Sequence, residues 1–146
     1  MKKKNIIIVI AVIFAIGIIS AGSVYKFVIN KPHQDYEKAK PAYIISAADL
    51  FDSYRSDRNL AEKKYNGQVV LLNGIINKVE ISDSMVTGVF VFEQGMFGDE
   101  GIRCLMLPQH EARLKSYAVG SEIQLKGYLT GYNDTDIILE QCSVIR

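Results

Sequence analysis

The side chains that could support covalent or metal chemistry in this chain are few and widely spaced. Its 146 residues include two cysteines and two histidines. Neither His33 nor His110 stands at a spacing from serine, cysteine or carboxylate that is typical of a nucleophile and its base. The sequence contains no G-x-S-x-G, H-E-x-x-H or phosphate-binding loop. We therefore expect a protein that is not an enzyme and that uses no cofactor.

Cys104 and Cys142 are the one pair of residues able to form an intrachain disulfide. They fall in two predicted strands that neighbour each other in the fold inferred below. A disulfide closing this long loop would stabilise an exported domain by roughly 3 to 4 kcal/mol, and we expect it to form. The alternative is a pair of buried free thiols that pack as small apolar side chains. Neither histidine has the spacing to complete a zinc site with these thiols, so no metal is expected.

Three aromatic side chains and one cation form a second set that could bind a ligand. Phe90 and Phe92 stand two residues apart in a predicted strand, which places both rings on one face. Arg103 and Tyr128 belong to two later strands and could line the same surface. Proteins that hold single-stranded nucleic acid stack bases on exposed rings and pair phosphates with cations, so these four residues are candidate ligand-binding side chains. In the alternative, both phenylalanines fill the protein interior.

The segment from Glu93 to Gly101 is the most unusual loop that the sequence predicts. It reads E-Q-G-M-F-G-D-E-G, with Met96 and Phe97 between glycines and close to acidic residues. A mobile apolar tip of this kind is suited to contacting a partner or a membrane surface. In the alternative, Phe97 folds back on the domain and the loop has no contact role.

Residues 1–25 are predicted to form a membrane helix. No charged residue lies from Asn5 to Tyr25, and a helix needs about 20 apolar residues to cross a bilayer core of about 30 Å. Lysines at 2–4 precede this stretch, whereas Lys26 alone follows closely, so the positive-inside rule places the N-terminus in the cytoplasm. We therefore expect a single span, with the remaining domain on the outer side of the cytoplasmic membrane.

The same features also describe a cleaved secretory signal. A basic start, an apolar middle and small residues at 20–23 are the three parts of such a signal, and Ala21 and Ser23 have a spacing that a signal peptidase accepts. Both interpretations send the downstream domain across the membrane. No cysteine lies near the segment, so a lipoprotein anchor is excluded.

The part of the chain beyond the membrane segment has an acidic charge balance. The whole chain has 17 basic and 16 acidic side chains, and setting aside the four lysines at 2–4 and 26 leaves 13 basic residues against 16 acidic ones. A nucleic-acid-binding surface is normally basic, because neutralising phosphates supplies most of its affinity. The charge balance therefore argues against nucleic acid as the ligand.

Residues 26–45 are predicted to be a tether. They contain Pro32 and Pro41 and few large apolar residues at a regular spacing. A flexible chain of roughly 20 residues has a typical end-to-end distance of about 25 Å, which would keep the domain close to the bilayer. The domain itself is expected to occupy residues 46–146.

A helix is predicted from Ser46 to Tyr65 at the start of this domain. Ser46 and Asp49 form an S-x-x-D capping box, and apolar residues then recur at helical spacing. Gly67 is suited to the left-handed position that follows a helix, so the helix should end just before it.

Beyond this helix the apolar residues alternate with polar ones, which indicates strands. Strands are predicted at 68–80, 86–92 and 102–107, followed by a short helix at 108–116 and by strands at 122–130 and 136–145. Gly74 falls in the middle of the long first strand, where a glycine usually marks a bulge or bend. We therefore expect a mainly β OB-fold, a five-stranded Greek-key barrel, with a preceding α-helix and a tether to the N-terminal transmembrane helix.

A set of glycine, aromatic and cysteine positions in this domain recurs at spacings known from one protein family. The matching positions are Ala61, Tyr65, Gly67 and Gly74, then Cys104, Leu114, Gly120, Lys126 and Gly127, and finally Leu139 and Cys142. From about residue 48 to 146 the chain thereby resembles the tRNA_anti-like, or anticodon-binding-like, family of small exported bacterial proteins. The resemblance implies an OB-like barrel preceded by a helix. The family name suggests nucleic-acid binding, but a shared fold does not establish a function.

Together these patterns favour a non-enzymatic binding or assembly module at the membrane, whose ligand is a protein or a saccharide-like molecule. The alternative is an OB-fold that binds single-stranded nucleic acid, such as tRNA or ssDNA, through the rings and the cation named above. The acidic charge balance favours the first hypothesis.

Overall fold

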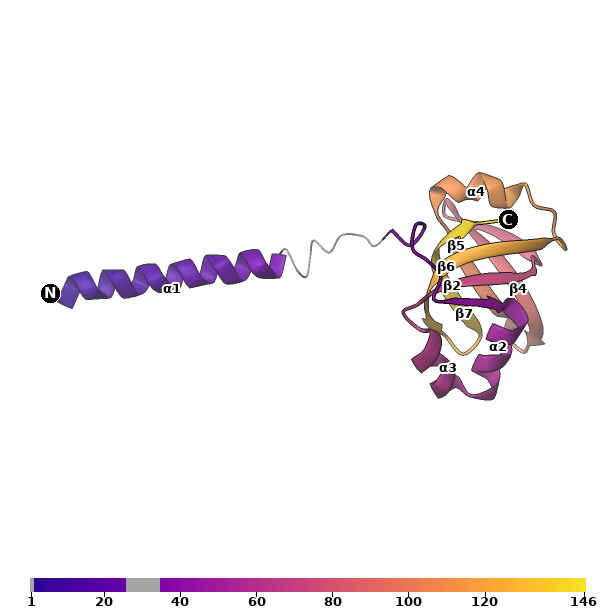
Figure 1. The fold of residues 1–146 in the computed structure, drawn as a ribbon, viewed down its shortest axis with the longest axis horizontal. Coiled ribbons are helices and arrows are strands. Elements are labelled where there is room, and N and C mark those ends of the chain that lie inside the picture. Colours follow the sequence, from indigo (N-terminus) through magenta and orange to yellow (C-terminus); the bar gives the residue numbers. More distant parts are fainter. Residues whose placement is uncertain (1, 26–34) are drawn as a thin grey trace. The chain divides into compact units, whose positions relative to one another are not determined.

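The computed structural model describes residues 2–25 and 35–146, which belong to two separate units (Figure 1). The first unit contains helix α1 (Lys2–Val24). Its stretch Ile6–Val24 is long and apolar enough to cross a membrane, and a secretory signal would meet the same criteria. The second unit begins at Asp35 and contains all other helices and strands of the described residues.

Two consecutive helices, α2 (Ala47–Ser56) and α3 (Arg58–Tyr65), replace the single helix predicted from 46 to 65. The capping role of Ser46 is confirmed, because its hydroxyl accepts a hydrogen bond from the Asp49 amide at 3.0 Å. The break falls at Asp57, which adopts an extended backbone. Its carboxylate caps α3 by accepting from the Leu60 amide at 3.0 Å, an arrangement that stabilises a new helix start.

Seven strands form one sheet in place of the five predicted. They are β1 (Tyr43–Ser46), β2 (Val69–Ile75), β3 (Lys78–Ser82), β4 (Met85–Gly95), β5 (Gly98–Met106), β6 (Glu122–Tyr132) and β7 (Asp136–Val144). Their order across the sheet is β1-β2-β6-β7-β5-β4-β3. Helix α4 (Pro108–Lys115) lies between β5 and β6 in the chain, as the sequence predicts for an OB-fold.

The extra strands have two origins. The predicted strand 68–80 divides into β2 and β3, because neighbouring amides bond in different directions: Ile76 donates to the Ser121 carbonyl and Asn77 to the Val89 carbonyl. Since β2 pairs with β6 and β3 pairs with β4, this one bent stretch joins the two sides of the sheet and curls it into a barrel. Strand β1 is new and pairs in parallel with β2.

The bend lies two residues beyond Gly74, so the predicted role of this glycine was wrong. A Cβ atom at Gly74 would lie 3.0 Å from the Cβ of Ala47 and 3.0 Å from the ring of Phe90. Gly74 therefore allows the helix and the ring to approach the strand closely.

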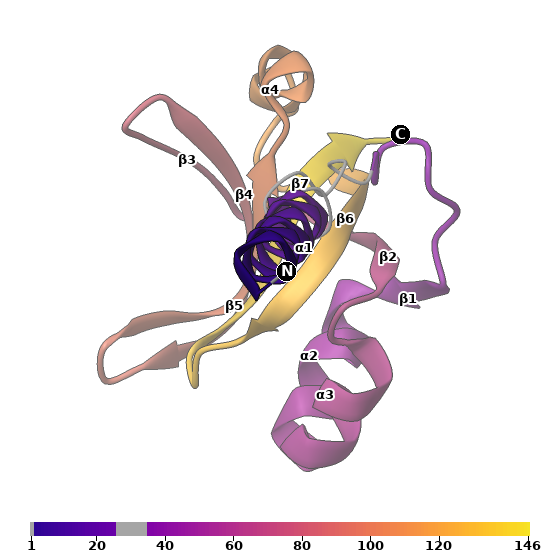
Figure 2. The ribbon, with the colours of Figure 1, turned by 90° about the vertical axis from the view of Figure 1, so that its left-hand side faces the viewer.

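Helices cover both ends of the barrel, as Figure 2 shows, with α4 at one end and α2 and α3 at the other. Leu114 of α4 is completely buried, and so are the α2 side chains that face the barrel. The buried side chains of α2 and α3 are Ala47, Leu50, Phe51, Tyr54, Ala61 and Tyr65. These helices therefore complete the apolar core that the strands enclose.

The segment from Glu93 to Gly101 is a tight hairpin rather than the predicted loop. Strands β4 and β5 pair as far as Gly95 and Gly98, so only two residues form the turn. Both turn residues are exposed, Met96 to 93% and Phe97 to 95%. The alternative in which Phe97 folds back on the barrel was therefore wrong.

The predicted disulfide was also wrong in this structure, where Cys104 and Cys142 are free and completely buried. Burial raises the pKa of the Cys142 thiol well above its usual value, and a hydrogen bond with Cys104 adds to the shift. The raised pKa keeps the Cys142 thiol protonated, and both buried cysteines pack as small apolar groups. Their close packing leaves no room at Gly127, where a Cβ atom would lie 2.4 Å from the Cys142 sulfur.

We expect Gly127→Ala to destabilise the barrel by roughly 1 to 3 kcal/mol, because the new methyl group would overpack the core. Gly131→Ala is the matched control in the same strand, since the nearest atom to its added Cβ is 4.0 Å away. Urea denaturation followed by near-ultraviolet circular dichroism measures both. Adding Cys142→Ala to Gly127→Ala should restore part of the loss, and no recovery would contradict the proposed clash.

Candidate ligand-binding face

The outer surface of β3, β4 and β5 is the natural place to look for the predicted ligand site, since OB-folds use this region. Strand pairing sets Lys78 opposite Val89 and Val89 opposite Arg103. Ile138 of β7 continues this row beyond Arg103. We call the outward side chains of β3, β4 and β5 the outer face.

Phe90 does not belong to the outer face. It pairs with Ile102, and both side chains are completely buried in the core. Because side chains alternate along a strand, Phe90 and Arg103 lie on opposite sides of the sheet. The candidate role of Phe90 in stacking a ligand was therefore wrong, and the alternative of a core phenylalanine is what the structure contains.

Phe92 is at the margin of the outer face and is 38% exposed. The strand pairing shifts between Val91 and Glu93, so Phe92 no longer follows the alternation of Phe90. One side of its ring stacks on Phe51 of α2, with 5.1 Å between ring centroids. At most one face of this ring is therefore left for a ligand.

Tyr128 points outward on β6, as the sequence indicated, but it is already covered. Its ring stacks on Tyr36, with the centroids 4.4 Å apart and the planes inclined by 20°. Tyr36 comes from the segment predicted to be a tether. The four candidate side chains are thus not brought together: one is buried, two are stacked on aromatic rings of the same chain, and Arg103 is ion-paired.

Arg103 lies between two carboxylates. Its Nε donates to Asp136 at 2.8 Å, and its Nη1 donates to Glu80 at 2.5 Å. Partial burial works against the charge of Arg103, but the hydrogen bonds to both carboxylates raise its pKa. Asp136 also accepts the Gly101 amide at 3.1 Å and is almost completely buried.

The second cation of the outer face is paired in the same way. Lys78 forms an ion pair with Asp99 of β5. The two cations of the outer face, Lys78 and Arg103, are therefore paired with three carboxylates, those of Glu80 and Asp99 on the same face and that of Asp136 on β7. Its positive charges are already satisfied within the protein.

A shallow apolar groove lies next to Phe92, with a volume of about 370 Å³. It is lined by Ser46, Ala47, Ala48, Asn73, Gly74, Ile75, Asn77, Val91 and Phe92. The Oδ1 atom of Asn73 is buried and has no hydrogen-bond partner among the described residues. No sequence pattern predicted this groove, because its residues come from β1, α2, β2, the bend after β2, and β4, and they meet only in the folded barrel.

Arg103→Met should destabilise the barrel by roughly 2 to 4 kcal/mol, because it leaves the buried carboxylate of Asp136 without its cation. Lys78→Met is the matched control on the same face. It removes a more exposed ion pair and should cost less than about 1 kcal/mol. Urea denaturation of the two variants measures the difference, and equal losses would contradict a central role for Arg103.

The comparisons with known proteins agree with this architecture. A candidate nucleic-acid-binding lipoprotein from Klebsiella pneumoniae has a similar structure, with a TM-score of 0.55 and 15% identity over 80% of this chain and 100% of that chain. The S. pombe Stn1–Ten1 complex matches less well, with a TM-score of 0.37 and 13% identity over 53% of this chain and 58% of that chain. No curated protein sequence matches.

At these identities, the similarity to the lipoprotein supports a common OB-like fold and says nothing about a common ligand. The sequence profile of the tRNA_anti-like family matches residues 1–144, which is nearly the whole chain. This match, together with the helix-capped barrel, places the chain in the tRNA_anti-like family.

Proposed function

We propose that this chain is a membrane-anchored, non-enzymatic binding module whose OB-fold domain recognises another protein. The observation that carries the proposal is the ion pairing of the outer face. Its cations are paired with carboxylates of the same domain. A protein ligand needs neither free cations nor a row of exposed rings.

The topology part of the proposal rests on α1 and its flanks. The lysines at 2–4 precede the apolar stretch Ile6–Val24, and Lys26 alone follows it closely. By the positive-inside rule, this bias favours a cytoplasmic N-terminus and a barrel on the outer side, and our proposal takes the segment to be an uncleaved anchor.

The β4–β5 hairpin is the surface best suited to a protein partner. Arg55 of α2 holds its base, donating to Glu93 at 2.8 Å and to Glu100 at 3.4 Å. A braced hairpin presents Met96 and Phe97 at little cost in conformational entropy, and large exposed apolar side chains commonly mark interaction sites.

The same tip is less suited to a saccharide-like ligand. A sugar site needs polar groups that fix the orientation of the ligand. Met96 and Phe97 are instead flanked by Gly95 and Gly98, which have no side chains to supply such groups. We therefore favour a partner protein with an apolar pocket.

Binding of single-stranded nucleic acid is the second candidate, and the family name and the Klebsiella lipoprotein favour it. Affinity for a nucleic acid comes largely from cations that release counterions from phosphates. On the outer face, such cations would first have to leave their carboxylate partners. This cost makes the nucleic-acid hypothesis the weaker one.

Titration of the full chain in detergent with a fluorescent single-stranded oligonucleotide separates the two hypotheses. We expect no saturable binding below about 100 μM protein, even at low salt. A variant carrying Glu80→Lys and Asp99→Lys is the positive control. It frees Lys78 and the Nη1 atom of Arg103, adds two lysines to the outer face and should gain salt-sensitive binding, although Arg103 keeps its pair with Asp136. Tight, salt-sensitive binding by the unchanged protein would overturn the proposal.

Replacing Phe97 with a photo-crosslinking amino acid in native membranes tests the protein-binding surface. We expect one discrete protein adduct, whose yield falls when Met96→Ser is added, because the partner contacts both side chains. Val119 is a control position with 64% exposure that lies outside the hairpin. Adducts with lipid alone, or the same protein adducts from both positions, would argue against the hairpin as the binding surface.

A further inference from the structure

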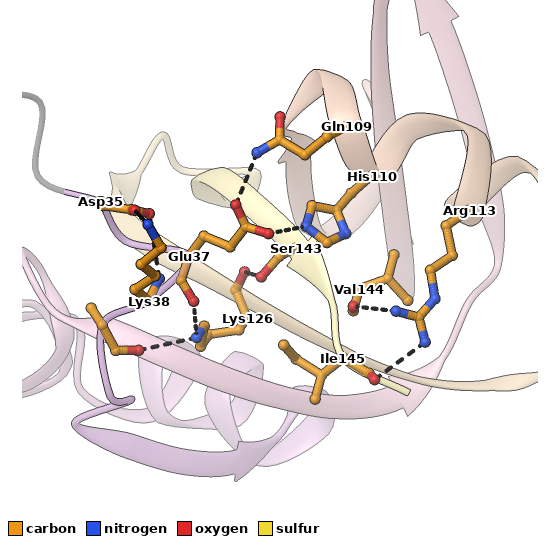
Figure 3. A network of polar contacts seen from close by, with 11 residues as sticks. Asp35, Glu37, Lys38, Gln109, His110, Arg113, Lys126, Ser143, Val144 and Ile145 are labelled. Carbon is orange, nitrogen blue, oxygen red and sulfur yellow. Dashed lines mark hydrogen bonds and ion pairs between the residues drawn. The ribbon is translucent and has the colours of Figure 1, made fainter.

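Part of the predicted tether is bound to the barrel. We call residues 35–42 the strap; Figure 3 shows its contacts with β6 and α4. The Nζ atom of Lys126 donates to the carbonyls of Glu37 at 2.5 Å and Ala39 at 3.0 Å. The Ala42 amide donates to the Val69 carbonyl at 2.7 Å. The prediction of a free tether over 26–45 was therefore wrong for this part, and residues 26–34 lie outside the described residues.

The centre of the strap is held through one carboxylate. Oε1 of Glu37 lies 2.7 Å from Nε2 of His110, and its Oε2 accepts from Gln109 at 2.9 Å. The hydrogen bonds to His110 and Gln109 lower the pKa of Glu37. The His110 side chain is only 15% exposed, so this ion pair is partly shielded from solvent.

The other charged groups around this contact have fixed charges at neutral pH. Asp35 pairs with Lys38 within the strap at 3.1 Å. Arg113 of α4 donates to the carbonyls of Val144 and Ile145, and Lys126 of β6 holds the strap carbonyls. Glu111 is the remaining acidic residue of α4. Among these groups, an imidazole is the one that changes its charge between about pH 5 and pH 8.

We propose that the strap is a reversible latch, closed by the ion pair between Glu37 and protonated His110 and loosened when His110 loses its proton. The Glu37 carboxylate attracts a charged imidazole more strongly than a neutral one, so we expect the strap to dock more tightly when His110 is charged than when it is neutral. Protonation of Glu37 limits docking at the acidic end, and its lowered pKa moves this limit to more acidic pH.

Release of the strap would change the reach of the barrel. Residues 35–42 would add at most about 29 Å of extended chain between the two units when they are released. Release would also uncover Tyr128 and Lys126, the ring and the cation that the strap occupies.

Hydrogen exchange of the full chain in detergent tests the latch, with protection factors measured at pH 5.5 and pH 8.0. We expect the Ala39 and Ala42 amides to lose protection by roughly fivefold at the higher pH, a typical effect of one partly exposed ion pair. The Leu129 amide, which donates to Gln68 within the barrel, is the internal reference and should not change. A parallel loss at Leu129 would mean global opening and would overturn the proposal.

Two variants test whether His110 is responsible for the pH dependence of strap protection. His110→Gln keeps a hydrogen-bond donor but not the titratable charge, so strap protection should become independent of pH, near the value of the unchanged protein at pH 8.0. Asp35→Asn is the matched control, because among the described residues Asp35 pairs with Lys38 of the strap itself, and it should keep the pH dependence. The latch is wrong if the unchanged protein shows equal protection at both pH values, or if His110→Gln retains the pH dependence.

Discussion

The bend between β2 and β3 is the constraint on which the barrel depends. At Ile76 and Asn77 consecutive amides donate to carbonyls on different sides, one at Ser121 and the other at Val89. A single stretch of chain therefore pairs with β6 before the bend and with β4 after it. Without this change of partner the strands would form an open sheet, and the strands at its two edges would lie apart. Closure also creates the enclosed core that α2, α3 and α4 cover.

Closure of the barrel decides the electrostatics of its surface as well. Glu80, Arg103 and Asp136 are far apart in the sequence, but strand pairing places them side by side. The resulting ion pairs neutralise cations that a count of charges would treat as free. An OB-fold that binds nucleic acid needs cations directed at phosphates. In this domain the cations of the outer face are directed at carboxylates, which is why we favour a protein ligand over the one that the family name suggests.

The strap binds to the barrel through contacts outside the buried core. Residues 35–42 contact β6 through Tyr128 and Lys126, and contact α4 through His110. Most of these contacts are polar or aromatic, and none belongs to the buried core cluster. Contacts of this kind are weaker than those of a packed core, so we expect that the strap leaves the barrel without unfolding it. The predicted tether and the domain are therefore not separate parts, because residues 35–42 of the tether bind to the barrel.

The sequence by itself determined the apolar helix, the place of the short helix between two groups of strands, and the family, because periodicity and capping signals act over a few residues and are visible locally. The prediction of one helix over 46–65 was wrong at Asp57. The side chain of Asp57 caps a second helix there, and the first helix ends. The placement of Phe90, Phe92, Arg103 and Tyr128 was decided only by the tertiary structure. A period of two shows that residues share a face, but not whether that face is inside the barrel, paired with carboxylates or covered by another segment. Those outcomes depend on contacts between residues distant in the chain, which form only when the barrel closes.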